Sequence, residues 1–120
     1  LPVQVAVIIS ADLSHTHQPD GPYGYSSTSK LFDHAVATWI QKDPCSHQDE
    51  LLQNAARWQP TALSCGFGGL VLANGMVCNS NATRSSFRSK LWAHGNATYY
   101  GMMVATIERK VMAPKDNIQS

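Results

Sequence analysis

Charged residues are scarce in this 120-residue chain, at 14% against about 25% in an average globular domain. Nine Lys and Arg nearly balance eight Asp and Glu, and they form no basic stripe, so we expect no nucleic-acid partner. The longest apolar run, Val5–Ile9, is far too short to cross a bilayer, so we expect no membrane span. Hydrophobic residues still make up 43% of the chain, which excludes intrinsic disorder and predicts one folded domain, with a homo-oligomer as one option for its apolar surface.

Cysteine is also rare, and its three positions form no CxxC pair, which excludes a common structural zinc motif. Cys45, Cys65 and Cys78 lie 20 and 13 residues apart and do not resemble a disulfide framework. An odd count favours reduced thiols in a cytoplasmic protein. Two glycosylation sequons, at Asn81 and Asn96, indicate the opposite compartment, but such short motifs arise often by chance and we expect both to be unused.

The chain opens with a β-branched apolar segment, Val3–Ser10, that lacks polar alternation. This pattern predicts a strand covered on both faces, as in a parallel α/β sheet. A polar stretch with two prolines and two glycines follows, from Asp12 to Gly24, and favours turns. Since open α/β folds place their sites just after the carboxyl ends of buried strands, we expect the functional site here.

Helical spacing of apolar residues predicts a helix over Leu31–Ile40, with Phe32, Val36 and Trp39 in the core. Serines between positions 26 and 29 are candidate N-caps for it, and Asp43-Pro44 ends it. A capping box at Ser46–Asp49 predicts a second helix that ends near Pro60.

The apolar stretch that follows predicts a helix over Ala62–Asn74, with a buried strand at Leu70–Ala73 as the competing interpretation. Beyond it we expect a polar loop at Asn79–Ser86 and a strand at Phe87–Trp92. A turn at His94–Asn96, a second strand at Thr98–Ile107 and a polar tail at residues 113–120 are expected to follow. The elements together predict one α/β domain over residues 1–112.

Several motifs resemble one family when taken in order. They are Ser-Ala-Asp-Leu-Ser-His at 10–15, Asp-Gly-Pro-Tyr-Gly-Tyr at 20–25, Phe-Asp at 32–33, Cys-Gly-Phe at 65–67 and the stretch Thr98–Ala105. This order resembles the C-terminal half of the class III extradiol ring-cleavage dioxygenases, the LigB-type catalytic subunit family, and their Memo-like relatives. The resemblance runs from about Val3 to Ile107 and covers about half of a normal family member. It implies a three-layer αβα fold with a mixed sheet.

The resemblance also implies an activity, in which non-haem Fe(II) held by two His and one carboxylate opens a catecholic or related aromatic ring with O₂. His15 matches the acid/base histidine of the family, and Asp12 and Ser14 would orient it. Cys65 lies near the third metal-ligand position, where Memo-like members have Cys, and a thiolate would favour Zn or Cu.

The loop after the first strand supplies the implied substrate contacts, which are Tyr23, Tyr25 and His17. The family's two metal-binding His lie in an N-terminal half that this sequence does not contain. The missing half, or a partner subunit, would have to complete the iron site. The alternative function is a non-catalytic, Memo-like or degenerate interaction module, for which Cys65 in place of a carboxylate is the cue.

Each candidate residue also has a simpler interpretation. His15 would otherwise be a loop histidine satisfied by backbone groups, and Asp12 a turn cap. Cys65 would otherwise be a small, inert core residue. His15 and His17 could also share one face of an extended segment and bind a metal by themselves.

Overall fold

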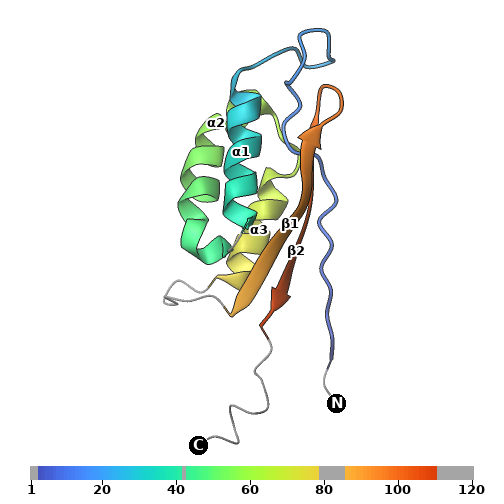
Figure 1. Ribbon diagram of the computed structural model, residues 1–120. Coiled ribbons are helices and arrows are strands. Elements are labelled where there is room, and N and C mark those ends of the chain that lie inside the picture. The colour runs from blue at the N-terminus through green and yellow to red at the C-terminus, as the bar shows by residue number, and fades with distance from the viewer. Residues whose placement is uncertain (1–2, 42, 79–85, 111–120) are drawn as a thin grey trace, which may run out of the picture.

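The computed structural model describes residues 3–41, 43–78 and 86–110. Its helical elements are α1 (Thr28–Ile40), the 3₁₀-helix η1 (Pro44–His47), the π-helix η2 (Glu50–Ala55), α2 (Ala56–Ala62) and α3 (Phe67–Val77). Strands β1 (Phe87–Asn96) and β2 (Gly101–Arg109) pair as an antiparallel hairpin, and the helices lie on one side of it (Figure 1). The chain therefore combines helices with an antiparallel two-stranded sheet. Within the described ranges, no helix is long and apolar enough to span a membrane.

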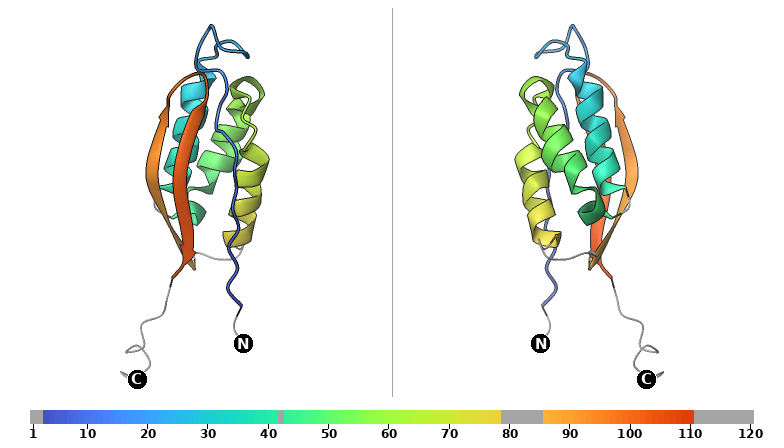
Figure 2. Two further views of the ribbon diagram at one scale, coloured as in Figure 1. Left: turned by 90° about the vertical axis from the view of Figure 1, so that its right-hand side faces the viewer. Right: turned by 90° about the vertical axis from the view of Figure 1, so that its left-hand side faces the viewer.

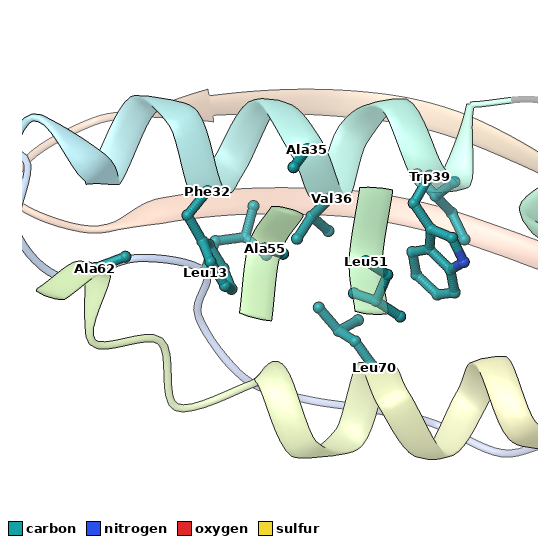
Figure 3. Packing of buried hydrophobic residues seen from close by; sticks show 10 residues of the cluster. Leu13, Phe32, Ala35, Val36, Trp39, Leu51, Ala55, Ala62 and Leu70 are labelled. Atoms are coloured by element: carbon teal, nitrogen blue, oxygen red, sulfur yellow. The ribbon is translucent and has the colours of Figure 1, made fainter. Parts of the chain in front are cut away.

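Helix α1 supplies the centre of the core, as its spacing predicts. Phe32, Val36 and Trp39 are each at most 1% exposed, and they face Leu51 of η2 and Leu70 of α3 (Figure 3). Burying such side chains stabilises the fold by about 1.5–3 kcal/mol each. The N-cap of α1 is Ser27, one of the predicted serines, but its side chain makes no capping hydrogen bond; the hydroxyl of Ser26 accepts the Thr28 N–H at 3.2 Å.

The helical segment after α1 begins earlier than the capping box predicts. The Asp43 carboxylate accepts the Cys45 N–H at 3.1 Å and thereby caps η1, so the prediction of Ser46 as the start is wrong. The reason is that Pro44 occupies the first helical position, where proline is favoured. The same segment continues through Pro60 and ends at Ala62, two residues beyond the predicted end.

The last helix and the hairpin have the predicted types with shifted bounds. Residues Leu70–Ala73 are helical within α3, so the competing strand interpretation is wrong. Strand β1 extends to Asn96, β2 begins at Gly101, and the turn lies between them rather than at His94–Asn96. Odd-numbered side chains from 103 to 107 of β2 pack against the core. The predicted loop lies outside the described residues except for Ser86, as does the tail at 113–120.

The predicted buried strand at Val3–Ser10 is wrong. The backbone there is extended and runs beside the hairpin and α3 (Figure 2), but every side chain in the segment is exposed, Val5 by 80% and Ile8 by 87%. Within the described ranges, no hydrogen bond between backbone groups joins the chain to another segment before Leu13. Apolar β-branched composition predicts extended backbone, but a strand also requires a neighbour at ladder distance.

Two of the three cysteines form a disulfide, so the expectation of reduced thiols is wrong for them. Cys45 of η1 and Cys78, just after α3, have Cα atoms 5.4 Å apart and are bridged, while Cys65 is free and exposed. An odd number of cysteines did not exclude a disulfide, because three cysteines can form one bridge and leave one free thiol. The bridge ties the two ends of the helical layer together.

Candidate functional site

The segment that carries the Ser-His motif is held in place between β2 and the end of α2. Leu13 N–H donates to Gly101 O at 2.9 Å and His17 N–H donates to Tyr99 O at 3.0 Å, both at the start of β2. Between them, His15 N–H donates in the other direction, to Ala62 O at 2.8 Å. Because the bonds alternate in direction, the backbone around His15 is fixed from both sides.

The His15 ring is held between a carbonyl and a carboxylate. Its Nδ1 lies 2.6 Å from Leu63 O, and its Nε2 lies 3.2 Å from an oxygen of Asp12. A carbonyl can only accept, so Nδ1 carries a hydrogen and Nε2 is the atom free to gain or lose a proton. The side chain is 15% exposed, so solvent and small molecules reach it only in part. Asp12, predicted beside His15, therefore contacts its ring.

Leu63 holds this ring from a backbone conformation that leucine rarely adopts. It ends α2 in the left-handed region, with φ 56° and ψ 49°, and its N–H donates to Gln59 O at 3.0 Å. It is the one described non-glycine residue with positive φ. Such a conformation costs roughly 1–2 kcal/mol and persists where surrounding structure enforces it, which is typical of functional sites.

Cys65 lies in the turn that follows Leu63 and joins the same cluster. The Asp12 N–H donates to its Sγ at 3.3 Å, and Ser64 Oγ donates to Asp12 O at 3.0 Å. One ligand-type atom each from Asp12, His15 and Cys65 lie within 4.8 Å of one another. A Cβ at Gly66 would meet Asp12 O at 2.9 Å, so glycine is needed for this close approach.

Aromatic rings lie beside His15. The ring centroids of Tyr23 and Tyr99 lie 5.4 Å and 6.1 Å from that of His15, and 6.2 Å from each other. Tyr25, predicted beside Tyr23 as a substrate contact, is 55% exposed and pairs by a backbone bridge with His17. Aromatic surface next to an imidazole suits an aromatic ligand.

His17 and Ser14 belong to a second, buried cluster. His17 Nε2 lies 2.7 Å from Asp33 Oδ2 and 2.8 Å from Ser14 Oγ, and the His17 and Asp33 side chains are 4% and 5% exposed. Both contacts use the same nitrogen, whereas a Ser-His-Asp triad uses the two ring nitrogens separately, so this is no triad. Ser14, expected to orient His15, contacts His17 instead, and its N–H donates to Asp33 Oδ1 at 3.0 Å.

A cavity of about 480 Å³ lies along the extended N-terminal segment, between α3 and β2. Its walls are mostly apolar, and Asp12 and Gly66 also line it, whereas His15 does not. The cavity thus reaches the Asp12 side of the cluster and not the His15 ring.

Three residues of the site were not predicted as site residues, although two of them, Asp33 and Tyr99, lie within the motifs that carry the resemblance. Asp33 had a visible signal, because a carboxylate three residues before Val36 and seven before Ile40 lies on the buried stripe of α1. Tyr99 had a weaker one, since it falls within a segment predicted as a strand. Leu63 had none, because its role comes from its backbone carbonyl and a conformation foreign to leucine.

The donor set does not match the facial triad of the resembled family. The described residues gather one imidazole, one carboxylate and one thiol, whereas the triad needs two imidazoles and a carboxylate. His17 is engaged with Asp33, His34 and His94 are exposed elsewhere, and His47 Nδ1 donates to Asp43 O. The described residues therefore do not bring together the ligand set that the resemblance implies for iron.

The sequence matches no protein-family model, and it matches none of the curated proteins with which it was compared.

Proposed function

We propose that this chain is the proton-carrying part of an extradiol-type ring-cleavage dioxygenase, with His15 as its acid/base residue. The single observation that supports the proposal most is the pair of contacts on the His15 ring. Leu63 O holds Nδ1 at 2.6 Å, so the proton that moves is the one at Nε2, beside Asp12 Oδ2 at 3.2 Å. A general acid/base requires this kind of fixed tautomer and positioned nitrogen.

The proposed substrate is a catecholic or related aromatic small molecule. The rings of Tyr23 and Tyr99 beside His15 support this class, because offset or edge contacts between aromatic rings stabilise binding by about 0.5–1.5 kcal/mol each. In this arrangement Nε2 accepts a proton from a substrate hydroxyl, and the Asp12 carboxylate stabilises the imidazolium that results.

The fold we propose for the complete protein is the three-layer αβα fold with a mixed sheet. The exposed extended segment at residues 3–10 supports it, because its β-branched side chains suit a strand with neighbours on both edges. The missing N-terminal half or a partner subunit would supply those neighbours and the iron ligands. Iron, once so held, would bind catechol and O₂.

We also propose a cytoplasmic location, which can be tested through the redox state of the three cysteines. A disulfide is typical of an oxidising compartment, so the Cys45–Cys78 bridge weighs against the cytoplasm. Counting free thiols in protein taken from its native source decides the question, because one free thiol contradicts a reducing compartment and three support it.

The test of function uses 4-nitrocatechol, whose colour reports whether its hydroxyl is ionised. We expect the chain to bind it with a spectral shift toward the ionised form, and His15→Gln to abolish the shift. His94→Gln is the matched control, since His94 is exposed on β1. An unshifted spectrum with the wild-type chain, or an equal shift with His15→Gln, contradicts the proposal.

Ring cleavage itself requires the completed protein. With the N-terminal half co-expressed, and Fe(II), catechol and O₂ supplied, we expect a yellow product and a loss of about 10²–10⁴-fold in kcat for His15→Gln. Folded, iron-loaded protein that forms no product contradicts the enzymatic role.

A second candidate is the non-catalytic interaction module. The exposed extended segment favours it, because unpaired strand edges with apolar side chains are recurrent sites of protein association. On this hypothesis Val7→Lys abolishes partner binding and His15→Ala leaves partner binding unchanged. The enzymatic hypothesis instead requires His15 for ring cleavage.

A further inference from the structure

We propose that Asp12, His15 and Cys65 form a self-contained binding site for a thiolate-preferring divalent cation such as Zn²⁺. The site differs from the two-His, one-carboxylate iron centre implied by the resemblance, because this chain alone supplies all three ligands. Binding does not depend on the proposed function.

The distances between the ligand atoms are close to those of a zinc site. Zinc bonds of about 2.0–2.3 Å in a tetrahedron place neighbouring ligand atoms roughly 3.3–3.6 Å apart. His15 Nε2 and the Asp12 oxygen are already 3.2 Å apart, and one ligand-type atom from each of the three residues lies within 4.8 Å of the others. Cys65 is exposed in the turn between α2 and α3, so its side chain has room to turn toward a bound cation.

The His15 ring is oriented as metal-binding histidines usually are. Such a histidine donates its second ring N–H to a carboxylate or a backbone carbonyl, which fixes the tautomer and aims the other nitrogen at the metal. His15 Nδ1 donates to Leu63 O at 2.6 Å, and Nε2 faces the cluster. This contact is independent of the spacing of the three ligands.

Cys65 lies at the N-terminal end of a helix. It immediately precedes Gly66, the N-cap of the 11-residue helix α3. The Asp12 N–H also donates to its sulfur at 3.3 Å. Cys45 and Cys78 are bridged, so Cys65 is the one thiol that can bind a metal.

The mixture of donors selects the cation. One sulfur, one imidazole nitrogen and one carboxylate oxygen suit Zn²⁺, whereas Mg²⁺ and Ca²⁺ prefer oxygen ligands alone. Three protein ligands leave a fourth position for water or a small ligand, as in catalytic rather than structural zinc sites. Binding releases the Cys65 thiol proton and occupies the His15 Nε2 lone pair, with no change in oxidation state.

Co²⁺ is the probe for the test, because thiolate coordination to it gives a charge-transfer band in the near ultraviolet. We expect chelator-treated chain to bind one Co²⁺ with this band, and Zn²⁺ to displace it. Cys65→Ser is expected to abolish the band, and His15→Gln and Asp12→Asn to weaken binding. His94→Gln is the control that leaves binding intact.

Alkylation of Cys65 supplies a second readout. We expect Zn²⁺ to slow the alkylation of Cys65 in the wild-type chain but not in the His15→Gln variant. The circular dichroism spectrum of the variant should match that of the wild type. Absence of Co²⁺ binding, binding without the charge-transfer band, or a band that persists in Cys65→Ser overturns the site.

The metal is also expected to affect proton transfer, an expectation that rests on the proposed function. Zn²⁺ at Nε2 removes the atom that accepts the substrate proton, so we expect it to suppress the 4-nitrocatechol shift. If Co²⁺ binds with its charge-transfer band and nitrocatechol is never ionised, the proposed function fails and the metal site stands.

Discussion

The backbone of Gly101 packs directly against the carboxylate of Asp33. A Cβ at position 101 would overlap Asp33 Oδ2, and the Cγ of Asp33 would lie 2.7 Å from it. Gly101 also exchanges backbone hydrogen bonds with Leu13 and Ser14. The contact therefore joins β2, α1 and the Ser-His segment at one point.

Gly101→Ala is expected to lower the free energy of unfolding by at least about 2 kcal/mol, because the carboxylate must leave its partners or the strand must move. Urea denaturation measures the change. Gly95→Ala is the matched control from the same hairpin, because nothing lies within 4 Å of its added Cβ. Equal stability of the two variants would refute the close packing at Asp33.

The buried His17–Asp33 pair is expected to be strongly coupled. Asp33→Ala leaves the His17 ring and the Ser14 N–H without their acceptor, so it costs about 3–5 kcal/mol of unfolding free energy. A double-mutant cycle with His17→Ala should give a coupling of about 1–3 kcal/mol.

The exposed pair Arg88–Glu108 serves as the comparison for that cycle. Its side chains are both 66% exposed, so Glu108→Ala should cost less than about 1 kcal/mol. Coupling energies of the same size in the two pairs would mean that burial does not strengthen the interaction between His17 and Asp33.

Removing the disulfide is expected to cost about 3–4 kcal/mol, since it closes a loop of 33 residues in the unfolded chain. The comparison is between Cys45→Ser/Cys78→Ser and the wild type in denaturant. Cys65→Ser keeps the bridge and should leave stability nearly unchanged. Alkylation of three thiols in the native protein would show that the bridge is absent.

The backbone of Leu63 can be tested apart from its side chain. Leu63→Ala and Leu63→Gly both remove the side chain, but only glycine relieves the positive φ of 56°. We expect the glycine variant to be more stable than the alanine variant by about 1 kcal/mol. The reverse order in thermal unfolding would show that residue 63 does not hold the left-handed conformation.

Local patterns predicted those parts of the fold that depend on neighbours in sequence. The spacing of Phe32, Val36 and Trp39 was sufficient to predict α1 and its buried face, because one helix satisfies its own backbone. Val3–Ser10 failed for the opposite reason, since a strand needs a partner that its own residues do not encode. The burial of Leu31 was not predictable for a similar reason. It belongs to the apolar pattern of α1 but is 45% exposed, because no described segment covers it fully.

The candidate site was predictable where it depends on side-chain type. Asp12, His15 and Cys65 were singled out from the sequence, and they lie together. It was not predictable that Ser14 and His15 would contact different parts of the chain. Neighbouring residues on an extended segment point in opposite directions, so Ser14 meets Asp33 of α1 and His15 meets Leu63 at the end of α2.

The bridge between Cys45 and Cys78 also governs what one break in the chain would do. A protease that cuts at Arg57, which is exposed on α2, would divide the polypeptide between the two bridged positions. The halves would stay covalently attached and migrate as one species on a denaturing gel until a reductant separated them.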